Sequence, residues 1–574
     1  MSGEGASRRE LLAGAGLLVL GVGLRMAFVL RVPTIAFSDF RALIDFGLEM
    51  RRQGWAPGTW HWIQFNPGLA MALSLVFRVF PDPETAARHA TAVWTGLMPL
   101  LPFLLWRPFL SLWWRLVAGL LLALWPGQIF FSGVVAQENW ALLPAVALGA
   151  LAVRVVRTTH AEQVVRTSGA AARPLAAGVL LAACTAFRQE LLVALLPAAI
   201  AAAGLLRKDG ARLRRAGGLA AAAAVPLLAL ACQRYQASGR FAITTEHGGL
   251  ALLGSVVPGA AEAGWVDPRA YIAAVEPDLL ENRTVARKAA SRLAAAEWRR
   301  RPAFHLLRSA SVSGRLAVES DADSLFWSVG SAQALPPGRM DGAGAGGPLY
   351  ARWFPRLRWE LALIQGLFLA SVWRALRRRD AAVLVLAACV VLKFALQSVA
   401  SPLGRLMIPA TALELLAIGL GLAELPTGRA RRRFGLAAVV GAVAALLLFA
   451  EPRLTALAIA KDEPPRPVSR FPLEISGGAD GGLARCVVEE GEVTSIEWRR
   501  VWVRPRAADQ PAHIRCTAKD VGAAGTLIVR VEGLAGTARD TDLGAGWITL
   551  SEAGGVSLWQ TTPTRSATPP TPQR

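Results

Sequence analysis

The feature that most constrains this chain is a series of long apolar runs separated by short segments rich in arginine. A helix of about 20 apolar residues spans the hydrocarbon core of a bilayer. Runs that reach or approach this length lie at 11–30, 87–106, 112–131, 141–158, 172–188, 190–206, 215–232, 358–375, 381–398, 403–424 and 433–450. The pattern predicts an all-α polytopic membrane protein with about 11 transmembrane helices.

The composition agrees with this prediction. Hydrophobic residues make up 53% of the 574 and charged residues only 18%, below the roughly 25% typical of soluble domains. A net charge of +21 is often a sign of nucleic-acid binding. Here the arginines lie between apolar runs, so they indicate membrane topology instead.

The basic residues also predict the orientation. Arginine and lysine collect in short cytoplasmic loops. A cytoplasmic N-terminus places six basic groups inside: 8–9, 107–115, 157–173, 207–215, 377–379 and 429–433. Counting the 15-residue apolar segment 66–80 as a span would reverse this agreement, so we expect it to lie in the interface. The run 11–30 is longer than a signal-peptide core and is expected to be a retained first span. The chain is thus placed in the inner or plasma membrane.

This topology predicts which segments lie on the outer face. They are the loops 31–86 and 233–357, with an amphipathic helix near 282–300, and all residues after the transmembrane domain 1–450. After a linker at 451–465, alternating short β-rich runs and turns predict a small extracytoplasmic β-sandwich at 466–560, followed by a Thr/Pro-rich tail at 561–574. Cys486 and Cys516 lie in this region, where an oxidising compartment would allow them to pair.

Two acids stand at the outer ends of predicted spans. Asp39 follows the first span, at a boundary where low dielectric can raise a carboxyl pKa toward that of a general base. The alternative is a solvated acid or a helix N-cap. Glu138 stands where the next short outer turn meets a span, and there it is either functional or a first-turn acid that complements the helix dipole.

Other polar residues gather on the same face. Arg405 enters the membrane from the outer side and therefore needs a partner such as a phosphate, unless it reaches the interface by snorkelling. Arg188 interrupts two apolar runs next to Glu190, and an internal ion pair is the simpler account. His61 belongs to an aromatic group (Trp55, Trp60, Trp62, Phe65) that either stacks on sugar rings or anchors the chain in the interface.

Taken together, the order and sidedness of these parts resemble the GT-C glycosyltransferases, in particular the branch of protein O-mannosyltransferases and aminoarabinose transferases (glycosyltransferase family 39). The resemblance covers about residues 10–425. The matching motifs are Ser38-Asp39-Phe40, Asn66-Pro67-Gly68-Leu69, Glu138, Thr244–Gly249 with Leu252-Leu253-Gly254-Ser255, and Arg405 to Pro409.

The resemblance implies transfer of a sugar, with inversion, from a polyprenyl-phosphate donor to an acceptor on the outer face. Asp39 would be the general base, assisted by Glu138, and these two carboxylates would hold a divalent metal ion if one is used. Arg405 would neutralise the lipid phosphate. The residues expected to contact the lipid phosphate or substrate are Arg405, Arg188, Glu246, His247 and His61. The acceptor is a protein, lipid or polysaccharide, and nucleic acid is not an expected partner.

Two other functions compete with this one. A flippase or transporter of a lipid-linked glycan would place charges near mid-span, as Lys393 is placed, but it would also show repeat symmetry, which is not evident here. A non-catalytic scaffold presenting the β-domain would not need Asp39, Glu138 or Arg405. The concentration of polar groups at one face favours the transferase.

Overall fold

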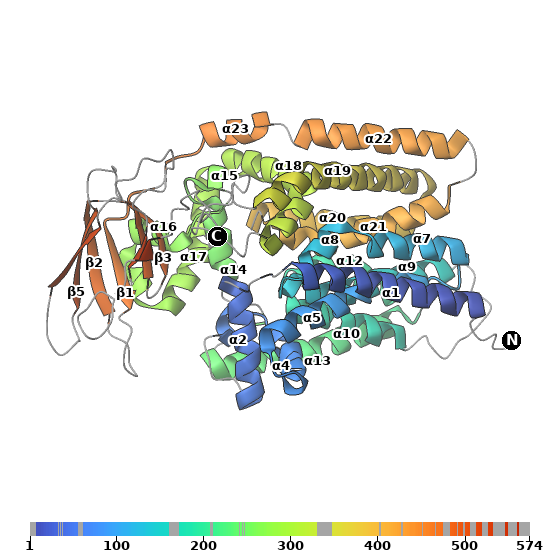
Figure 1. The fold of residues 1–574 in the computed structure, drawn as a ribbon, viewed down its shortest axis with the longest axis horizontal. Helices are drawn as coiled ribbons and strands as arrows, with labels where there is room; N and C mark the ends of the chain where they lie inside the picture. The colour runs from blue at the N-terminus through green and yellow to red at the C-terminus, as the bar shows by residue number, and fades with distance from the viewer. Residues whose placement is uncertain are drawn as a thin grey trace, which may run out of the picture. The chain divides into compact units, whose positions relative to one another are not determined.

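The computed structural model is mostly helical (Figure 1). It divides into two compact units: unit 1 holds Met1–His247, Leu307–Gln333 and Gly342–Ala456, and unit 2 holds Gly248–Leu306, Ala334–Asp341 and Leu457–Arg574. The structure describes residues 7–32, 34, 36, 38–55, 61–159, 172–206, 210–239, 241–243, 245, 247–263, 265–329, 347–400, 403–425, 429–449, 452–464, 466–474, 483–490, 492–497, 500–504, 512–518, 526–531, 546–548 and 560–561.

Unit 1 is built from helices. They are α1 (Arg8–Arg31), α2 (Ser38–Gln53), α3 (His61–Gln64), α4 (Gly68–Val79), α5 (Pro83–Gly96), α6 (Leu100–Leu105), α7 (Leu112–Ala123), α8 (Pro126–Phe131), α9 (Gln137–Thr159), α10 (Ala172–Phe187), α11 (Leu191–Ala194), α12 (Leu196–Ala202), α13 (Arg212–Ser238), most of α18 (Pro302–Val329), α19 (Gly347–Arg378), α20 (Ala381–Ala400), the 3-10 turn η3 (Gly404–Met407), α21 (Ile408–Ala423) and α22 (Arg429–Phe449).

The predicted apolar runs all lie on helices, although several are broken into two. Pro126 begins α8, and a proline lies in the first turn of α12; because proline has no N–H to donate, each starts a new helix. In the described part, five helices are long and apolar enough to span a membrane: Arg8–Arg31, Gln137–Thr158, Arg212–Gln236, Ala381–Ala400 and Gly404–Ala423. The chain is therefore a multi-pass membrane protein, and the count of eleven spans stays a prediction.

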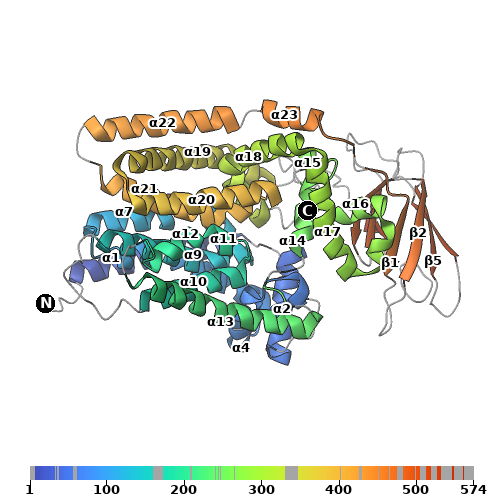
Figure 2. The same ribbon diagram turned by 180° about the vertical axis from the view of Figure 1, so that it is seen from behind.

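Small residues allow the helices of unit 1 to approach closely. A Cβ added to Gly96 would lie 2.7 Å from the Cα of Val22, so α5 packs directly on the backbone of α1. A Cβ on Gly366 of α19 would lie 2.7 Å from the backbone nitrogen of Ala442, and α19 and α22 run side by side (Figure 2). Close packing of this kind holds helices together within a bilayer, where there is no hydrophobic driving force between them.

One fully buried arginine joins three helices. Arg25 of α1 donates to the carbonyl oxygens of Ala123 (3.2 Å) and Leu122 (3.0 Å) at the end of α7 and to the side chain of Gln128 of α8. These donations satisfy α7 carbonyls that have no partner within their own helix.

The segment after α1 folds into a short helical layer. Helix α4 occupies the apolar segment 66–80, and its exposed side chains Leu75, Val79 and Phe80 suit the interfacial position that the sequence predicts. Asn66, just before α4, is held from two sides: Gln137 donates to its carbonyl (2.9 Å) and Arg234 of α13 to its side-chain oxygen (3.0 Å).

Unit 2 combines short helices with β-strands. Its helices are α14 (His247–Val256), α15 (Ala260–Ala263), α16 (Pro268–Val275), the 3-10 helix η1 (Pro277–Glu281), α17 (Arg283–Arg300), the first residues of α18, and α23 (Pro452–Ala460) from Leu457 onward. Helix α17 agrees with the amphipathic helix expected near 282–300, and α23 lies within the predicted linker. Tyr271 of α16 donates a hydrogen bond to Glu297 of α17, which also pairs with Arg300 (2.8 Å).

The strands are β1 (Arg470–Glu474), β2 (Leu483–Glu490), β3 (Glu492–Glu497), β4 (Arg500–Arg504), β5 (Ala512–Ala518), β6 (Thr526–Val531), β7 (Gly546–Ile548) and β8 (Gln560–Thr561). They form two antiparallel four-stranded sheets in the orders β1-β2-β5-β6 and β3-β4-β7-β8. The strands share a core with α14, α16, η1 and α17, so residues expected in an outer loop and residues after 466 form one unit. The sandwich arrangement and its extracytoplasmic side stay predictions, and the tail beyond Thr561 lies outside the described residues.

Cysteine bonding follows the register of this sheet. Cys486 is disulfide-bonded, and Cys516 lies directly opposite it in the β2–β5 ladder. Among the described residues, Cys184, Cys232 and Cys389 are free.

Candidate functional site

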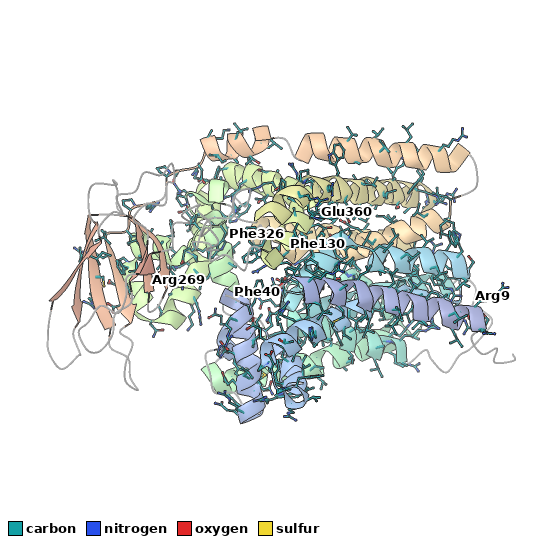
Figure 3. All side chains as sticks on the ribbon, in the orientation of Figure 1. Arg9, Phe40, Phe130, Arg269, Phe326 and Glu360 are labelled. Carbon is teal, nitrogen blue, oxygen red and sulfur yellow. The ribbon has the colours of Figure 1, made fainter. Side chains whose placement is uncertain are left out.

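Six charged side chains from five segments of unit 1 lie near one end of its helices. This end is where α1, α10 and α20 finish and where α9 and η3 begin. Figure 3 shows that Arg9 and Phe40 lie toward opposite ends of α1, with Phe40 on the side of the site. We name these six residues the charge cluster: Asp39, Glu138, Arg188, Glu190, Lys393 and Arg405.

Glu138 connects the two arginines of the charge cluster. It lies in the first turn of α9 and is 4% exposed. Its Oε1 lies 3.4 Å from Nη1 of Arg188 and 4.0 Å from Nε of Arg405. A carboxylate so buried is stable only beside cations, and it holds the two guanidinium groups at one point.

Glu190 connects the cluster to a lysine inside α20. Its Oε1 accepts from Nε of Arg188 at 2.9 Å and from Nζ of Lys393 at 3.0 Å. Lys393 is 2% exposed and also donates to Oε1 of Gln397 at 3.1 Å. The charge of Lys393 is thus paired within the cluster.

Arg405 is held by aromatic rings and by α18. Its guanidinium carbon lies 4.2 Å from the ring centre of Trp327 and 4.7 Å from that of Phe40, the distances of cation–π contacts. Its backbone N–H donates to Oδ2 of Asp323 at 2.8 Å. Its Nε is buried and has no hydrogen-bond partner among the described residues. The guanidinium is therefore held in place but keeps a donor that could bind a ligand.

Gly404 allows this arrangement. A Cβ at this position would lie 2.7 Å from Cα of Ser320 and 2.9 Å from Cβ of Asp323, both on α18. Only glycine lets η3 approach α18 this closely, so the residue next to Arg405 fixes where its backbone lies.

Asp39 is half-buried in the first turn of α2, beside the ring of Phe40 that packs on Arg405. Its carboxylate acts electrostatically on Arg188. A small hollow is lined in part by Thr34, Phe40 and Arg88.

The loop between α10 and α11 brings a further predicted motif near the cluster. The backbone N–H of Thr245 donates to Oε1 of Gln189, whose neighbours in sequence are Arg188 and Glu190. The Thr-rich stretch after α13 therefore reaches the cluster. Glu246 itself lies outside the described residues, as does the side chain of His247.

His61 is not brought into the charge cluster by any contact that the structure describes. Its Nδ1 lies 2.8 Å from Oε2 of Glu49, and its ring stacks on Phe46 with the centroids 5.2 Å apart. Trp62 is fully buried and Phe65 is 8% exposed, so these two rings pack inside the protein. Trp60 lies outside the described residues.

A metal held by Asp39 and Glu138 stays a prediction. In the part of the chain that the structure describes, no group of three or more His, Cys, Asp or Glu side chains is arranged to hold a metal ion. Glu138 already faces two guanidinium groups, which compete with a divalent cation for its oxygens.

Sequence reasoning missed two residues that shape the site and gave a third another role. Asp323 and Trp327 lie in the predicted outer loop 233–357, where the sequence did not suggest a buried helix. The feature of the sequence that could have indicated one is the face of small and polar residues on α18. Lys393 was interpreted as a charge in the middle of a span. A lysine at that depth in the membrane requires a partner, which the sequence alone did not identify.

The fold and the charge cluster define a class: a multi-pass helical membrane protein with a buried ion network at one end of its helices. Among solved structures, the chain is similar to the oligosaccharyltransferase of Archaeoglobus fulgidus in the apo form (TM-score 0.43, 14% identity). It is also similar to the archaeal oligosaccharyltransferase AglB from Archaeoglobus fulgidus in complex with an inhibitory peptide and a dolichol-phosphate (TM-score 0.39, 14% identity). Each match covers 79% of this chain and 56% of the other. No protein-family model and no curated protein matches the chain.

Proposed function

We propose that this protein is an integral-membrane glycosyltransferase of the GT-C type. It moves a sugar from a polyprenyl-phosphate donor to a hydroxyl-bearing acceptor on the extracytoplasmic face, with inversion. The observation that carries the proposal is the meeting of Glu138, Arg188 and Arg405 at one point, with Asp39 acting electrostatically on Arg188, although these residues are far apart in sequence. Helix packing alone does not require acids and arginines at a single point.

The chemistry needs two opposed functions, and the charge cluster has a residue for each. Asp39 accepts the proton of the acceptor hydroxyl as its oxygen forms a bond to the anomeric carbon. The bond from that carbon to the phosphate oxygen breaks on the opposite face, and the lipid phosphate leaves with the negative charge. Arg405, stacked between two rings with an unsatisfied Nε, stabilises this charge.

The remaining members of the charge cluster position these groups. Glu138 keeps the guanidinium groups of Arg188 and Arg405 near each other despite their like charge. Arg188 interacts electrostatically with Asp39, the proposed base. Arg188 also belongs to the proposed contacts with the lipid phosphate.

The proposed orientation has independent support in unit 2. The disulfide of Cys486 suits an oxidising compartment, as expected if the C-terminal strands are extracytoplasmic. The cytoplasmic N-terminus follows from the distribution of arginines.

A flippase of a lipid-linked glycan is the alternative, and Lys393 is the observation that favoured it. A lysine on a transport path would face a cavity in mid-membrane. Lys393 is instead bonded to Glu190 and Gln397 at the end of the helices where Arg405 lies, which favours the transferase.

The test is release of sugar from a panel of polyprenyl-phosphate sugars by purified protein in detergent with crude acceptor membranes. Wild type is compared with Asp39→Asn and with a matched control, Asp45→Asn, which alters an exposed acid on the same helix that pairs only with Arg41 (3.1 Å) among the contacts described. Circular dichroism and size exclusion first establish equal folding of the three proteins. We expect Asp39→Asn to lower turnover at least 100-fold and Asp45→Asn to leave it within about twofold.

Each outcome bears on a different part of the proposal. Equal turnover of wild type and Asp39→Asn removes Asp39 as the base and moves attention to Glu138. Absence of turnover with every donor, together with movement of labelled lipid-linked glycan across liposomes that carry the protein, replaces the transferase with the flippase.

A further inference from the structure

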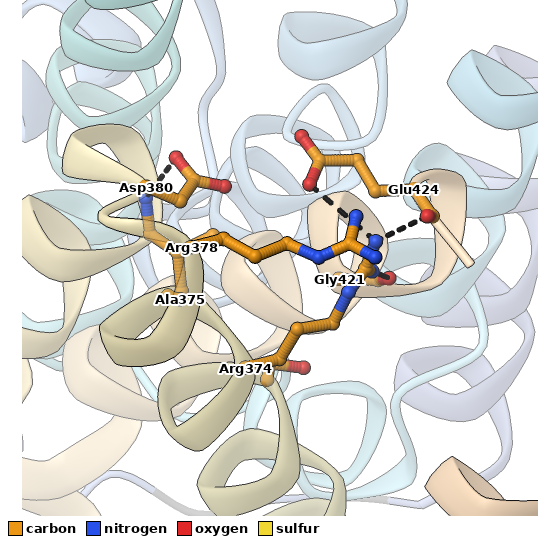
Figure 4. Close-up of a pocket in the computed structure, with 8 residues that line it drawn as sticks. Arg374, Ala375, Arg378, Asp380, Gly421 and Glu424 are labelled. Atoms are coloured by element: carbon orange, nitrogen blue, oxygen red, sulfur yellow. Dashed lines mark hydrogen bonds and ion pairs between the residues drawn. The ribbon is translucent and has the colours of Figure 1, made fainter. Parts of the chain in front are cut away.

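A second group of charges lies at the other end of the helices, where α19 and α21 finish and α20 begins. It surrounds a small hollow, which we name the arginine pocket. Figure 4 shows Arg374 and Arg378 of α19 extending toward the end of α21, where Gly421 and Glu424 lie. The lining residues are Ser371, Arg374, Ala375, Arg378, Asp380, Val383, Gly421 and Glu424.

Most charges of the arginine pocket are already paired. Arg157 of α9 forms ion pairs with both Asp380 and Glu424. Arg374 donates to the carbonyl oxygens of Gly421 (2.6 Å) and Glu424, and so closes the C-terminal end of α21. Its guanidinium lies 3.8 Å from the Glu424 carboxylate. The two acids therefore serve Arg157 and Arg374.

Arg378 is the charge left over. It is exposed, lines the pocket, and has no ion pair or hydrogen bond from its guanidinium in the described part of the chain. Its side chain and that of Arg374 extend toward the same end of α21 (Figure 4), and their like charges repel each other. Like charges placed together beside a hollow favour an anion between them.

The location indicates which anion is available. Helices α20 and α21 are among the five candidate spans, so their ends lie at the level of the lipid headgroups. Trp373, which is 58% exposed, carries the guanidinium of Arg377 over its ring at 4.6 Å, an arrangement typical of side chains at the membrane interface. The orientation predicted from the arginines makes this the cytoplasmic leaflet, which carries anionic phospholipids.

We propose that the arginine pocket binds the phosphate of an anionic phospholipid, with Arg378 as the principal ligand and Arg374 beside it. Arg378, which lines the pocket, is exposed, so a phosphate reaches it from the membrane surface while the acyl chains remain in the bilayer. Guanidinium groups bind phosphate with two parallel hydrogen bonds. The site lies at the opposite end of the helices from the charge cluster and does not depend on the proposed transferase activity.

The test measures binding of labelled phosphatidylglycerol to the full-length protein in mixed micelles. Wild type is compared with Arg378→Gln and with a matched control, Arg352→Gln, which removes an exposed arginine near the other end of α19. Phosphatidylcholine and inorganic phosphate, each at matched ionic strength, serve as competitors. Because Arg378 is exposed and bonds to no described residue, its substitution leaves the helix packing intact.

We expect Arg378→Gln to weaken phosphatidylglycerol binding about five- to tenfold and Arg352→Gln to leave it unchanged. Neither phosphatidylcholine nor inorganic phosphate should compete at equal concentration. Unchanged binding by Arg378→Gln, or an equal loss in both variants, overturns the site. Equal competition by inorganic phosphate shows that the site binds anions without selecting a lipid. Equal competition by phosphatidylcholine shows that the site does not distinguish headgroup charge. Either result overturns the proposal.

Discussion

The pair of Glu190 and Lys393 offers the sharpest test of how the charge cluster is stabilised. Their charged atoms lie 3.0 Å apart, and the lysine side chain is only 3% exposed. At an effective dielectric constant of about 20, this separation corresponds to an attraction of about 5.5 kcal/mol. Desolvation offsets part of this energy, so removing one partner of such a pair typically costs about 3–5 kcal/mol.

Substitution of Glu190 by Gln should lower the free energy of unfolding by about 3 kcal/mol. The lower end of the range applies because Lys393 keeps its hydrogen bond to Gln397 (3.1 Å). Lys393→Met should cost only about 1 kcal/mol, since Glu190 is 22% exposed and keeps Arg188 as a partner. The double variant buries no unpaired lysine, so its free energy of unfolding should fall by only about 2 kcal/mol. The two single variants together lose about 4 kcal/mol, and the difference gives a coupling energy of about 2 kcal/mol.

The assay is unfolding of the detergent-solubilised protein by sodium dodecyl sulfate in mixed micelles, followed by circular dichroism. The three variants and wild type form a double-mutant cycle. A coupling energy below about 0.5 kcal/mol would refute the reasoning, because the two charges would then contribute independently.

Three further predictions concern other parts of the chain. Gly404→Ala should destabilise the protein by about 1–3 kcal/mol, because the added Cβ would lie 2.7 Å from a backbone atom of α18. The control is Gly16→Ala, whose Cβ would have nothing within 4 Å. It should not destabilise the protein in the same unfolding assay. Burial and the hydrogen bond to Glu297 raise the pKa of Tyr271, so the stability it contributes is complete below pH about 10 and is lost as the pH rises toward the folded pKa. The phenolate absorbance of wild type and Tyr271→Phe checks this, and a Tyr271 that ionises at the same pH as the exposed Tyr235 contradicts it. Cys486→Ser should lower the free energy of unfolding by about 3 kcal/mol, since a disulfide from Cys486 to Cys516 closes a loop of about 30 residues. Thiol labelling of denatured, unreduced wild type should find three free cysteines. Five labelled cysteines would exclude the disulfide.

The helices were predictable because the bilayer leaves few alternatives. A backbone in hydrocarbon must satisfy its own hydrogen bonds, so a long apolar run has to be helical. The same rule does not locate the breaks within a run. Those at Pro126 and near Pro197 depend on prolines that the hydropathy pattern averages out.

The charge cluster was predictable in part for the same reason. Charges are costly in a membrane, so Glu138, Arg188 and Arg405 had to lie near partners or water. Which partner each would meet depends on tertiary packing: the sequence does not show that Glu138 faces both arginines or that Trp327 covers Arg405. Asp323 and Trp327 were missed because α18 lacks the length of apolar sequence that marks a span.

The bonds to Asn66 have a consequence for how the chain is assembled during synthesis. Gln137 follows Asn66 by 71 residues and Arg234 by 168. At about 5–20 residues per second, the first bond becomes available roughly 4–14 s after Asn66 is made and the second roughly 8–34 s after. The turn before α4 is therefore secured in two stages, and a ribosome-bound chain that ends before α13 holds that turn by only one of its two bonds.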